Sequence, residues 1–316
     1  MPPKCNHLSD EVMRHLTQIF ISFSISAFLI LFPLNAQALS EPTQIAQSSA
    51  QDLFKLGIAK IQGDNYQGAV EYFTQAIQID ARFAAAFSNR CLAYIQLGDA
   101  QSAIRDCTQA LNLSPNNREG YLNRGLAYYR QGHYQAAIAD YNQLISRSPL
   151  DFRAYYNRGL ARLELKHYTE AIADYNQTLS LIPQRHSPLL ANVYNDRGIV
   201  HLMLKNTPFA IADFSLAIRL NGNDYRAYYN RGCASGRQGS YTAAMRDFTQ
   251  ALQLNPNNPE AYLNRGMAHY NLGYHQKALR DLQQAANHFL NQGKTLAYQQ
   301  TLDLIGQIQE QTAVFA

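Results

Sequence analysis

The chain has 316 residues, of which 47% are hydrophobic and 16% are charged, so it has enough apolar residues to bury a core and is not disordered by composition. Its formal net charge is +4, and it contains no block of five or more lysines and arginines. Nucleic-acid binders carry clustered positive charge, so the charge pattern argues against that class of protein.

Residues 1–38 have the order of a secretory signal peptide. Two basic residues, Lys4 and Arg14, precede an apolar run over 19–32, and an Ala-x-Ala pattern ends at Ala38. The run is about fourteen residues long, shorter than the roughly twenty that a membrane-spanning helix needs. We therefore expect cleavage after Ala38 and export to the periplasm or a comparable envelope or lumenal compartment. An uncleaved membrane anchor is the alternative, because the leader is long and contains acidic residues.

A polar linker over 39–49, without helical periodicity, leads into a region that repeats every 34 residues. The interval between successive NRG-type segments is 34 except once, where it is 39, so we place a five-residue insertion at 186–190. These segments begin at Asn89, Asn123, Asn157, Asp196, Asn230 and Asn264. The period predicts seven units, over 50–83, 84–117, 118–151, 152–185, 191–224, 225–258 and 259–291.

Each unit contains two amphipathic stretches with apolar residues three and four positions apart, which predicts two helices. A glycine able to adopt positive φ stands between the two stretches in most units, and a proline follows the second stretch. The glycines are Gly98, Gly132, Gly239 and Gly273, and the prolines are Pro115, Pro149, Pro183 and Pro256. Each unit is therefore expected to be a helix–turn–helix.

The units resemble the tetratricopeptide repeat family over about residues 50–291. Counted from the start of a unit, an aromatic residue stands at position 4, Gly at 8, Ala at 20, a second aromatic at 24 and Pro near the end. The departures are Leu53 at position 4, Cys91 at position 8 and Gly222 in place of a proline. The resemblance implies an all-α, right-handed superhelical solenoid of seven helix–turn–helix units.

Residues 292–316 are expected to form a capping helix and tail. A solenoid exposes the apolar side of its last unit unless a helix with one polar face covers it. The segment has an apolar stripe at Leu296, Leu302, Ile305 and Ile308 that suits this role.

The resemblance also implies that the solenoid binds a protein or peptide in a concave groove lined by the first helices. Position 6, the first residue of each NRG-type segment, faces this groove, and a similar asparagine series in O-linked N-acetylglucosamine transferases holds an extended peptide by its backbone. An amide side chain both donates and accepts, which suits this contact. The alternative is that the asparagines are merely tolerated in the helices or cap local turns. The other groove candidates are Tyr129, Tyr156, Tyr229, Tyr270, Arg130, Arg153, Arg226 and Arg237.

Asp196 interrupts the asparagine series just after the insertion. We therefore expect the groove to divide there, with a cationic ligand group preferred beside Asp196.

No residue pattern supports catalysis or a cofactor. The histidines lack metal-ligand spacing, no glycine-rich phosphate loop follows a strand pattern, and no nucleophile elbow is present. We therefore predict a protein-interaction scaffold that is not an enzyme, with no metal, no cofactor, and membrane contact only through an uncleaved leader. The alternatives are a helical-repeat nucleic-acid binder and a non-catalytic subunit of an envelope enzyme complex.

Arginine at position 7 and aspartate at position 23 occur together in units two to seven, and both are absent from unit one. There Leu56 and Tyr72 occupy the two positions, so pairing between successive units would leave Arg90 facing Tyr72. The pattern therefore favours ion pairs within each unit, which can be bidentate, and common descent of units two to seven without contact is the alternative. They are Arg90–Asp106, Arg124–Asp140, Arg158–Asp174, Arg197–Asp213, Arg231–Asp247 and Arg265–Asp281.

Cys91 and Cys107 stand at positions 8 and 24 of the second unit, so we expect them to lie close together across the helix pair. A disulfide requires Cα atoms within about 7 Å and suitable Cβ directions. We favour two separate small core side chains, and a disulfide is the alternative.

Overall fold

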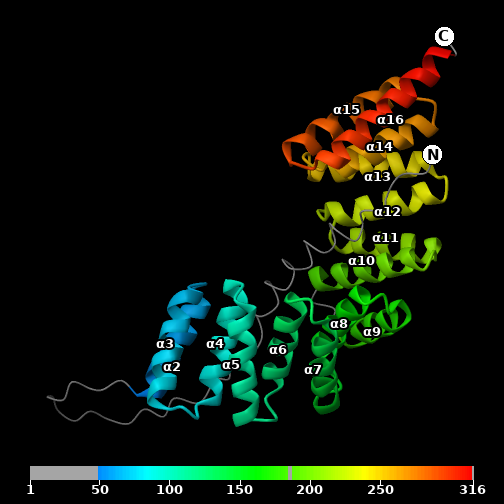
Figure 1. Cartoon of the computed structure of the whole chain (residues 1–316). Helices are drawn as coiled ribbons and strands as arrows, with labels where there is room; N and C mark the ends of the chain where they lie inside the picture. The colour runs from blue at the N-terminus through cyan, green and yellow to red at the C-terminus, as the bar shows by residue number, and fades with distance from the viewer. Residues whose placement is uncertain (1–48, 184–186, 315–316) are drawn as a thin grey trace. The chain divides into compact units, whose positions relative to one another are not determined.

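The structure, a computed structural model, describes residues 49–183 and 187–314, and every element in these ranges is a helix. The predicted signal peptide and nearly all of the predicted linker lie outside the described residues. Fifteen helices, α2 to α16, form seven helix–turn–helix pairs and a capping helix, which confirms the all-α repeat solenoid (Figure 1). We keep the unit numbering as repeats 1 to 7.

The first helices of the repeats are α2 (Ala50–Gln62), α4 (Ala84–Leu97), α6 (Arg118–Arg130), α8 (Phe152–Glu164), α10 (Ser187–Met203), α12 (Tyr225–Arg237) and α14 (Pro259–Asn271). The second helices are α3 (Tyr66–Ile79), α5 (Ala100–Leu113), α7 (Tyr134–Arg147), α9 (Tyr168–Leu181), α11 (Thr207–Leu220), α13 (Tyr241–Leu254) and α15 (His275–Asn291), and α16 (Thr295–Val314) is the cap.

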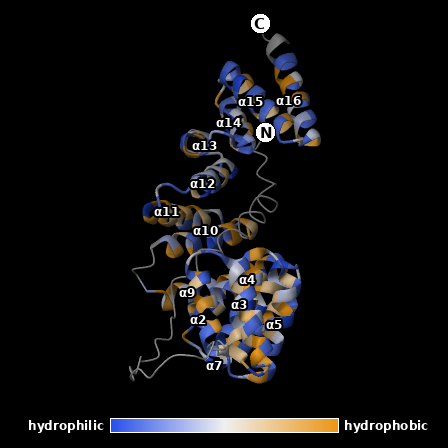
Figure 2. Ribbon diagram, turned by 90° about the vertical axis from the view of Figure 1, so that its left-hand side faces the viewer, coloured by the Kyte–Doolittle hydropathy of each residue, from blue (hydrophilic) through white to orange (hydrophobic). Residues whose placement is uncertain are grey.

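The described residues divide into two compact bodies, an N-terminal body over 49–165 and a C-terminal body over 166–314. Within each body, first helices contact the first helices of neighbouring repeats: α4 contacts α6, α6 contacts α8, α10 contacts α12, and α12 contacts α14. We call the layer that the first helices form in each body its first-helix face. Hydrophilic and hydrophobic residues mix along the helices (Figure 2), and among the described residues no helix has the length and apolarity needed to span a bilayer.

Within most repeats, a glycine at position 8 lets an aromatic ring at position 24 pack directly against the first helix. A Cβ atom added to Gly125 would lie 2.6 Å from the ring of Tyr141, and one added to Gly198 would lie 2.7 Å from Phe214. Both rings are fully buried. The glycine is therefore required by the close approach of the two helices.

The turn between paired helices uses positive φ, as the sequence predicts. Gly98, Gly132, Gly239 and Gly273 have φ values of 76–80°. In repeats 4 and 5, Lys166 and Lys205 occupy the same position with φ of 60° and 61°.

The insertion lengthens a helix. The first helix of repeat 5, α10, begins at Ser187, four residues before the boundary that the period predicts. Leu189 and Leu190 are buried. These apolar side chains stabilise the added turn because they pack into the core.

The capping helix packs through a seam that differs in part from the predicted stripe. Leu304 and Ile308 are buried against Met267 and Leu282. Leu296 was expected in the stripe but is 74% exposed. At about 100° per residue it lies roughly 120° around the helix from Ile308, on another face.

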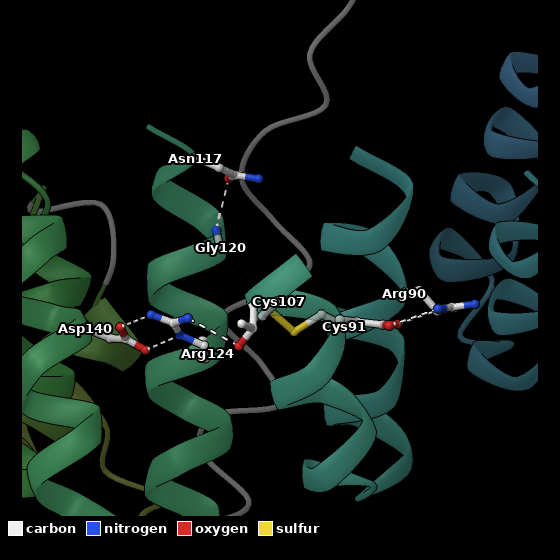
Figure 3. The surroundings of a disulfide bond; sticks show 9 residues. Arg90, Cys91, Cys107, Asn117, Gly120, Arg124 and Asp140 are labelled. Carbon is white, nitrogen blue, oxygen red and sulfur yellow. Dashed lines mark hydrogen bonds and ion pairs between the residues drawn. A yellow bond between two sulfur atoms is a disulfide. The ribbon is translucent and has the colours of Figure 1, made fainter. Parts of the chain in front are cut away.

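Repeat 2 contains a disulfide between Cys91 and Cys107, with their Cα atoms 5.4 Å apart (Figure 3). The favoured expectation of two separate core side chains is therefore wrong. Positions 8 and 24 face each other across the helix pair, as the glycine–ring contacts of other repeats show, and this brings the two sulfur atoms within bonding range.

Candidate peptide-binding face

Bidentate ion pairs hold the two helices of a repeat together and orient the first helix. In each, the arginine Nε and Nη2 atoms donate to both oxygens of the aspartate, at 2.6–2.9 Å. This confirms pairing within a repeat, while the pair of Arg158 with Asp174 stays a prediction. The observed pairs are Arg90–Asp106, Arg124–Asp140, Arg197–Asp213, Arg231–Asp247 and Arg265–Asp281.

The same arginines also reach the preceding repeat, which the sequence analysis missed. Each donates through Nη1 to a side-chain oxygen at position 25 of that repeat, at 2.6–3.4 Å. The signal was present, because position 25 carries a hydroxyl or amide in every repeat that precedes such an arginine. The acceptors are Thr74, Thr108, Asn142, Asn176, Ser215 and Thr249. Repeat 1 carries neither the arginine nor the aspartate, since Leu56 and Tyr72 occupy those positions.

In the C-terminal body, the position-6 asparagines bind neighbouring first helices. Asn264 is 0% exposed and donates through Nδ2 to the hydroxyl of Tyr229 at 3.0 Å. Asn230 donates to Oδ1 of Asn195 at 3.0 Å. Asp196 is 2% exposed and accepts a hydrogen bond from Asn195 at 3.4 Å, and the preference for a cationic ligand group beside it stays a prediction.

In the N-terminal body, the position-6 asparagines behave differently. Asn123 and Asn157, 7% and 8% exposed, make no side-chain hydrogen bond with any residue that the structure describes, and neither amide is sealed from solvent. Asn89 is half-buried and donates to the carbonyl of Ala85 in its own helix. Asn123 and Asn157 therefore carry the amides that remain available on α6 and α8.

The candidate tyrosines mostly pack between helices. Tyr129, Tyr156 and Tyr229 are buried, and Tyr270 is half-buried. Tyr129 donates to Glu164 of the next repeat at 3.2 Å, and Tyr270 donates to Gln311 of the capping helix. Their rings therefore pack within the first-helix face and offer little surface to a ligand.

The candidate arginines fall into two kinds. Arg130 and Arg237 donate to the carbonyls of Ile95 and Leu202 in the preceding first helix, and burial lowers the pKa of both guanidinium groups. Arg153 is half-buried, which favours its neutral form, but its bonds to acidic neighbours outweigh burial and raise its pKa. Those neighbours are Asp151 and Glu119, and Arg226 similarly binds Asp224 and Asn192.

Two histidines, the half-buried His201 and the buried His269, lie beside the ion pairs. His201 Nε2 lies 4.0 Å from Asp213, and His269 Nε2 lies 3.6 Å from Asp281. Burial lowers the pKa of both imidazoles. Across the described ranges, no three His, Cys, Asp or Glu side chains are grouped to hold a metal ion.

Family models match several parts of the chain. Models described as tetratricopeptide repeat or TPR repeat match residues 53–83, 91–132, 122–186, 236–273 and 259–291, together more than half of the chain. The chain belongs to the tetratricopeptide repeat (TPR) family. TPR proteins are typically non-catalytic scaffolds that bind proteins or peptides.

Solved TPR structures share the fold of this chain at low sequence identity. A TPR protein from Parabacteroides merdae is 21% identical, with a TM-score of 0.61 over 80% of this chain and 98% of that one. YrrB, a TPR protein with an unusual peptide-binding site, is 20% identical, with a TM-score of 0.51 over 62% and 97%. A chain of the APC/C hetero-tetramer Cut9–Hcn1 is 19% identical, with a TM-score of 0.60. The match covers 70% of the present chain but only 43% of the Cut9–Hcn1 chain. A search of curated proteins gave no significant match.

Proposed function

We propose that this TPR chain is a protein-interaction scaffold that binds an extended polypeptide segment along the first-helix face of its N-terminal body. The observation that carries the proposal is the pair of unbonded amides of Asn123 and Asn157 on the adjacent helices α6 and α8. An extended chain presents alternating N–H and C=O groups, and an amide side chain can accept from one and donate to the other. Backbone contacts of this kind give affinity with little sequence preference.

Side-chain preference would come from the residues beside these amides. Leu126 and Leu160, at position 9 of the same helices, are 5% and 1% exposed, so they pack in the core and offer almost no apolar surface to a peptide. Arg130 has no carboxylate partner among the described residues, whereas Arg153 already binds Glu119. We therefore expect the bound segment to carry an acidic side chain toward the end of α6.

We also infer that the scaffold works in an oxidising compartment outside the cytosol. The disulfide between Cys91 and Cys107 supports this, because such bonds persist in secreted and periplasmic proteins and are rare where thiols are kept reduced. The signal-like order of residues 1–38 points the same way. Mass spectrometry of the exported chain should find Leu39 at its N-terminus, and an intact leader in the membrane fraction would support the anchor instead.

Crosslinking capture from the envelope fraction, followed by binding of synthetic peptides from the captured partner, tests the peptide site. The variant N123A/N157A should weaken peptide binding by roughly tenfold or more, since two hydrogen bonds to the peptide are lost. Its melting temperature should stay close to that of the wild type, because neither amide bonds to a described residue.

The matched control is N112A/N287A, which removes two exposed asparagines of second helices. It should bind the peptide as the wild type does. Undiminished binding by a folded N123A/N157A protein would refute the site and leave these asparagines as tolerated helix residues.

A further inference from the structure

In repeats 1, 3, 5, 6 and 7, the contact between positions 8 and 24 joins a glycine to a large side chain. Phe73, Tyr141, Phe214 and Phe248 pack on the glycine at position 8, and a Cβ atom added there would lie 2.4–2.8 Å from the ring. Repeat 7 uses Leu282 in the same way, at 3.1 Å. A residue larger than glycine at position 8 is therefore incompatible with an aromatic ring at position 24.

Repeat 2 changes both positions together. Cys91 replaces the glycine and Cys107 replaces the ring, and both are fully buried. The largest fully buried side chain of this helix pair is Ile95, at position 12. The contact at positions 8 and 24 of repeat 2 therefore consists of the two cysteine side chains alone.

The neighbouring ion pair places the cysteines opposite each other. Arg90 and Asp106 stand one residue before Cys91 and Cys107, and Arg90 binds both carboxylate oxygens of Asp106 at 2.6 and 2.9 Å. Figure 3 shows the sulfur bridge between the two helices with Arg90 beside it. The ion pair fixes the register of α4 against α5, so the thiols meet whenever the helices pair.

We propose that the Cys91–Cys107 disulfide is a redox-dependent lock that takes the place of the glycine–aromatic contact in repeat 2, so that stable pairing of α4 with α5 depends on oxidation. Closing the lock is thiol–disulfide exchange with a disulfide oxidant: the two thiols lose two protons and two electrons, their S–S bond forms, and the oxidant is released as two thiols. A dithiol reductant reverses the step with the same balance. In the reduced state, two thiols fill less of the space that a ring fills in other repeats, and the chain constraint across 16 residues is lost.

Loss of the lock should reach beyond repeat 2. A solenoid repeat is stabilised largely by its neighbours, and repeat 1 is the terminal repeat whose α2 and α3 contact α4. Because both cysteines are fully buried, a reductant reaches them only when the pair opens. The oxidised state therefore resists reduction until the repeat loosens.

Amide hydrogen exchange of the full chain tests the proposal. Oxidised protein is compared with protein reduced by dithiothreitol in mild denaturant and returned to native buffer, with thiol status mapped by alkylation and mass spectrometry. Exchange in α4 and α5 should be on the order of a hundredfold faster in the reduced state, from the loop constraint alone. Exchange in α10 and α11, which contain no cysteine, should not change.

Two variants separate the covalent bond from packing. C91A/C107A should exchange like the reduced protein with or without reductant. C91G/C107F restores the residues of the other repeats, so its α4 and α5 should be protected under both conditions. Equal exchange in oxidised wild type, reduced wild type and C91A/C107A would overturn the lock, whether or not C91G/C107F folds.

Discussion

The two bodies use the same residue at the same repeat position for different purposes. In the C-terminal body, Asn230 and Asn264 bond to the preceding first helix, whereas in the N-terminal body Asn123 and Asn157 bond to no described residue. The residue 35 positions earlier, at position 5 of the preceding repeat, explains the difference. Long polar side chains stand there in the C-terminal body, Asn195 and Tyr229, and they reach the asparagine amide.

In the N-terminal body, the corresponding residues are Ser88 and Leu122, which are too short or apolar to do so. A repeat position therefore acquires its role from its neighbour in the preceding repeat. Other contacts, such as the arginine–aspartate pairs, occur in both bodies, and substitutions there should lower the stability of each body equally.

Replacing an arginine of the ion pairs should lower the free energy of unfolding more than any other change considered. The loss should be equal in the two bodies. Arg124 and Arg231 each bind one aspartate in two places and one hydroxyl of the preceding repeat. R124A and R231A each leave a buried carboxylate unpaired, which should lower the free energy of unfolding by about 2–4 kcal/mol. This figure already allows for solvent screening of the partly exposed guanidinium.

Denaturant unfolding with double-mutant cycles measures this, using R124A/D140A and R231A/D247A. A coupling energy near zero in one body alone would show that the ion pairs, too, have diverged between the bodies. Arg118, an exposed arginine of α6 that bonds only to Ser148 among the described residues, provides the control R118A, which should change stability little.

Replacing the glycine at position 8 with alanine should cause the next largest loss of stability. G125A and G198A would each place a Cβ atom within 2.7 Å of a buried ring, on Tyr141 and Phe214 respectively. Overpacking of this kind costs about 1–3 kcal/mol. Thermal unfolding of each variant should show a lowered melting temperature, with G306A as control, because a Cβ atom there meets nothing within 4 Å. Unchanged melting of G125A or G198A would mean that the helices can separate without cost.

The sequence predicted the helices and much of the ion pairing because both follow from local periodicity and from co-occurring residue types. It could not predict which asparagines remain available, because that depends on residues 35 positions away and on how neighbouring helices are placed. The disulfide was weighed but not favoured, since spacing gives proximity and not Cβ direction. The bond of each arginine to position 25 was not predicted because it joins two successive repeats, whereas the co-occurrence of arginine and aspartate is a pattern within one repeat.

The hydroxyl of Tyr229 allows a direct test of the asparagine comparison. Y229F removes the hydroxyl acceptor of Asn264 Nδ2 and leaves it only the long contact to Cys233 Sγ at 4.0 Å. Oδ1 of Asn264 already has no partner within the part of the chain that the structure describes. Leaving this buried amide with only a weak sulfur acceptor should cost about 1–2 kcal/mol. N157A in the N-terminal body should change stability much less. Denaturant unfolding compares the two variants, and equal costs would remove the distinction between the bodies.

Acidification should change stability least, and the change should have opposite signs in the two bodies. In the C-terminal body, burial lowers the pKa of His201 and His269 below the ordinary value of about 6.5, against the opposing charges of Asp213 and Asp281. The unfolded chain then binds more protons than the folded chain once the pH falls below about 6.5, so stability is lost from there down to the folded pKa. Nearby Arg197, Arg265 and Lys277 act in the same direction as burial.

In the N-terminal body, burial raises the pKa of Glu164 above its ordinary value, against a hydrogen bond from Tyr129 that lowers it. The folded chain there binds more protons than the unfolded chain as the pH falls toward that pKa, so this group adds stability on acidification. Amide protection of α10–α15 should therefore decrease relative to that of α4–α7 between about pH 7 and about pH 5, after correction for intrinsic exchange rates. The variant H201Q/H269Q should lose most of the decrease in the C-terminal body. If the decrease persists in that variant, groups other than these two imidazoles control the acid sensitivity.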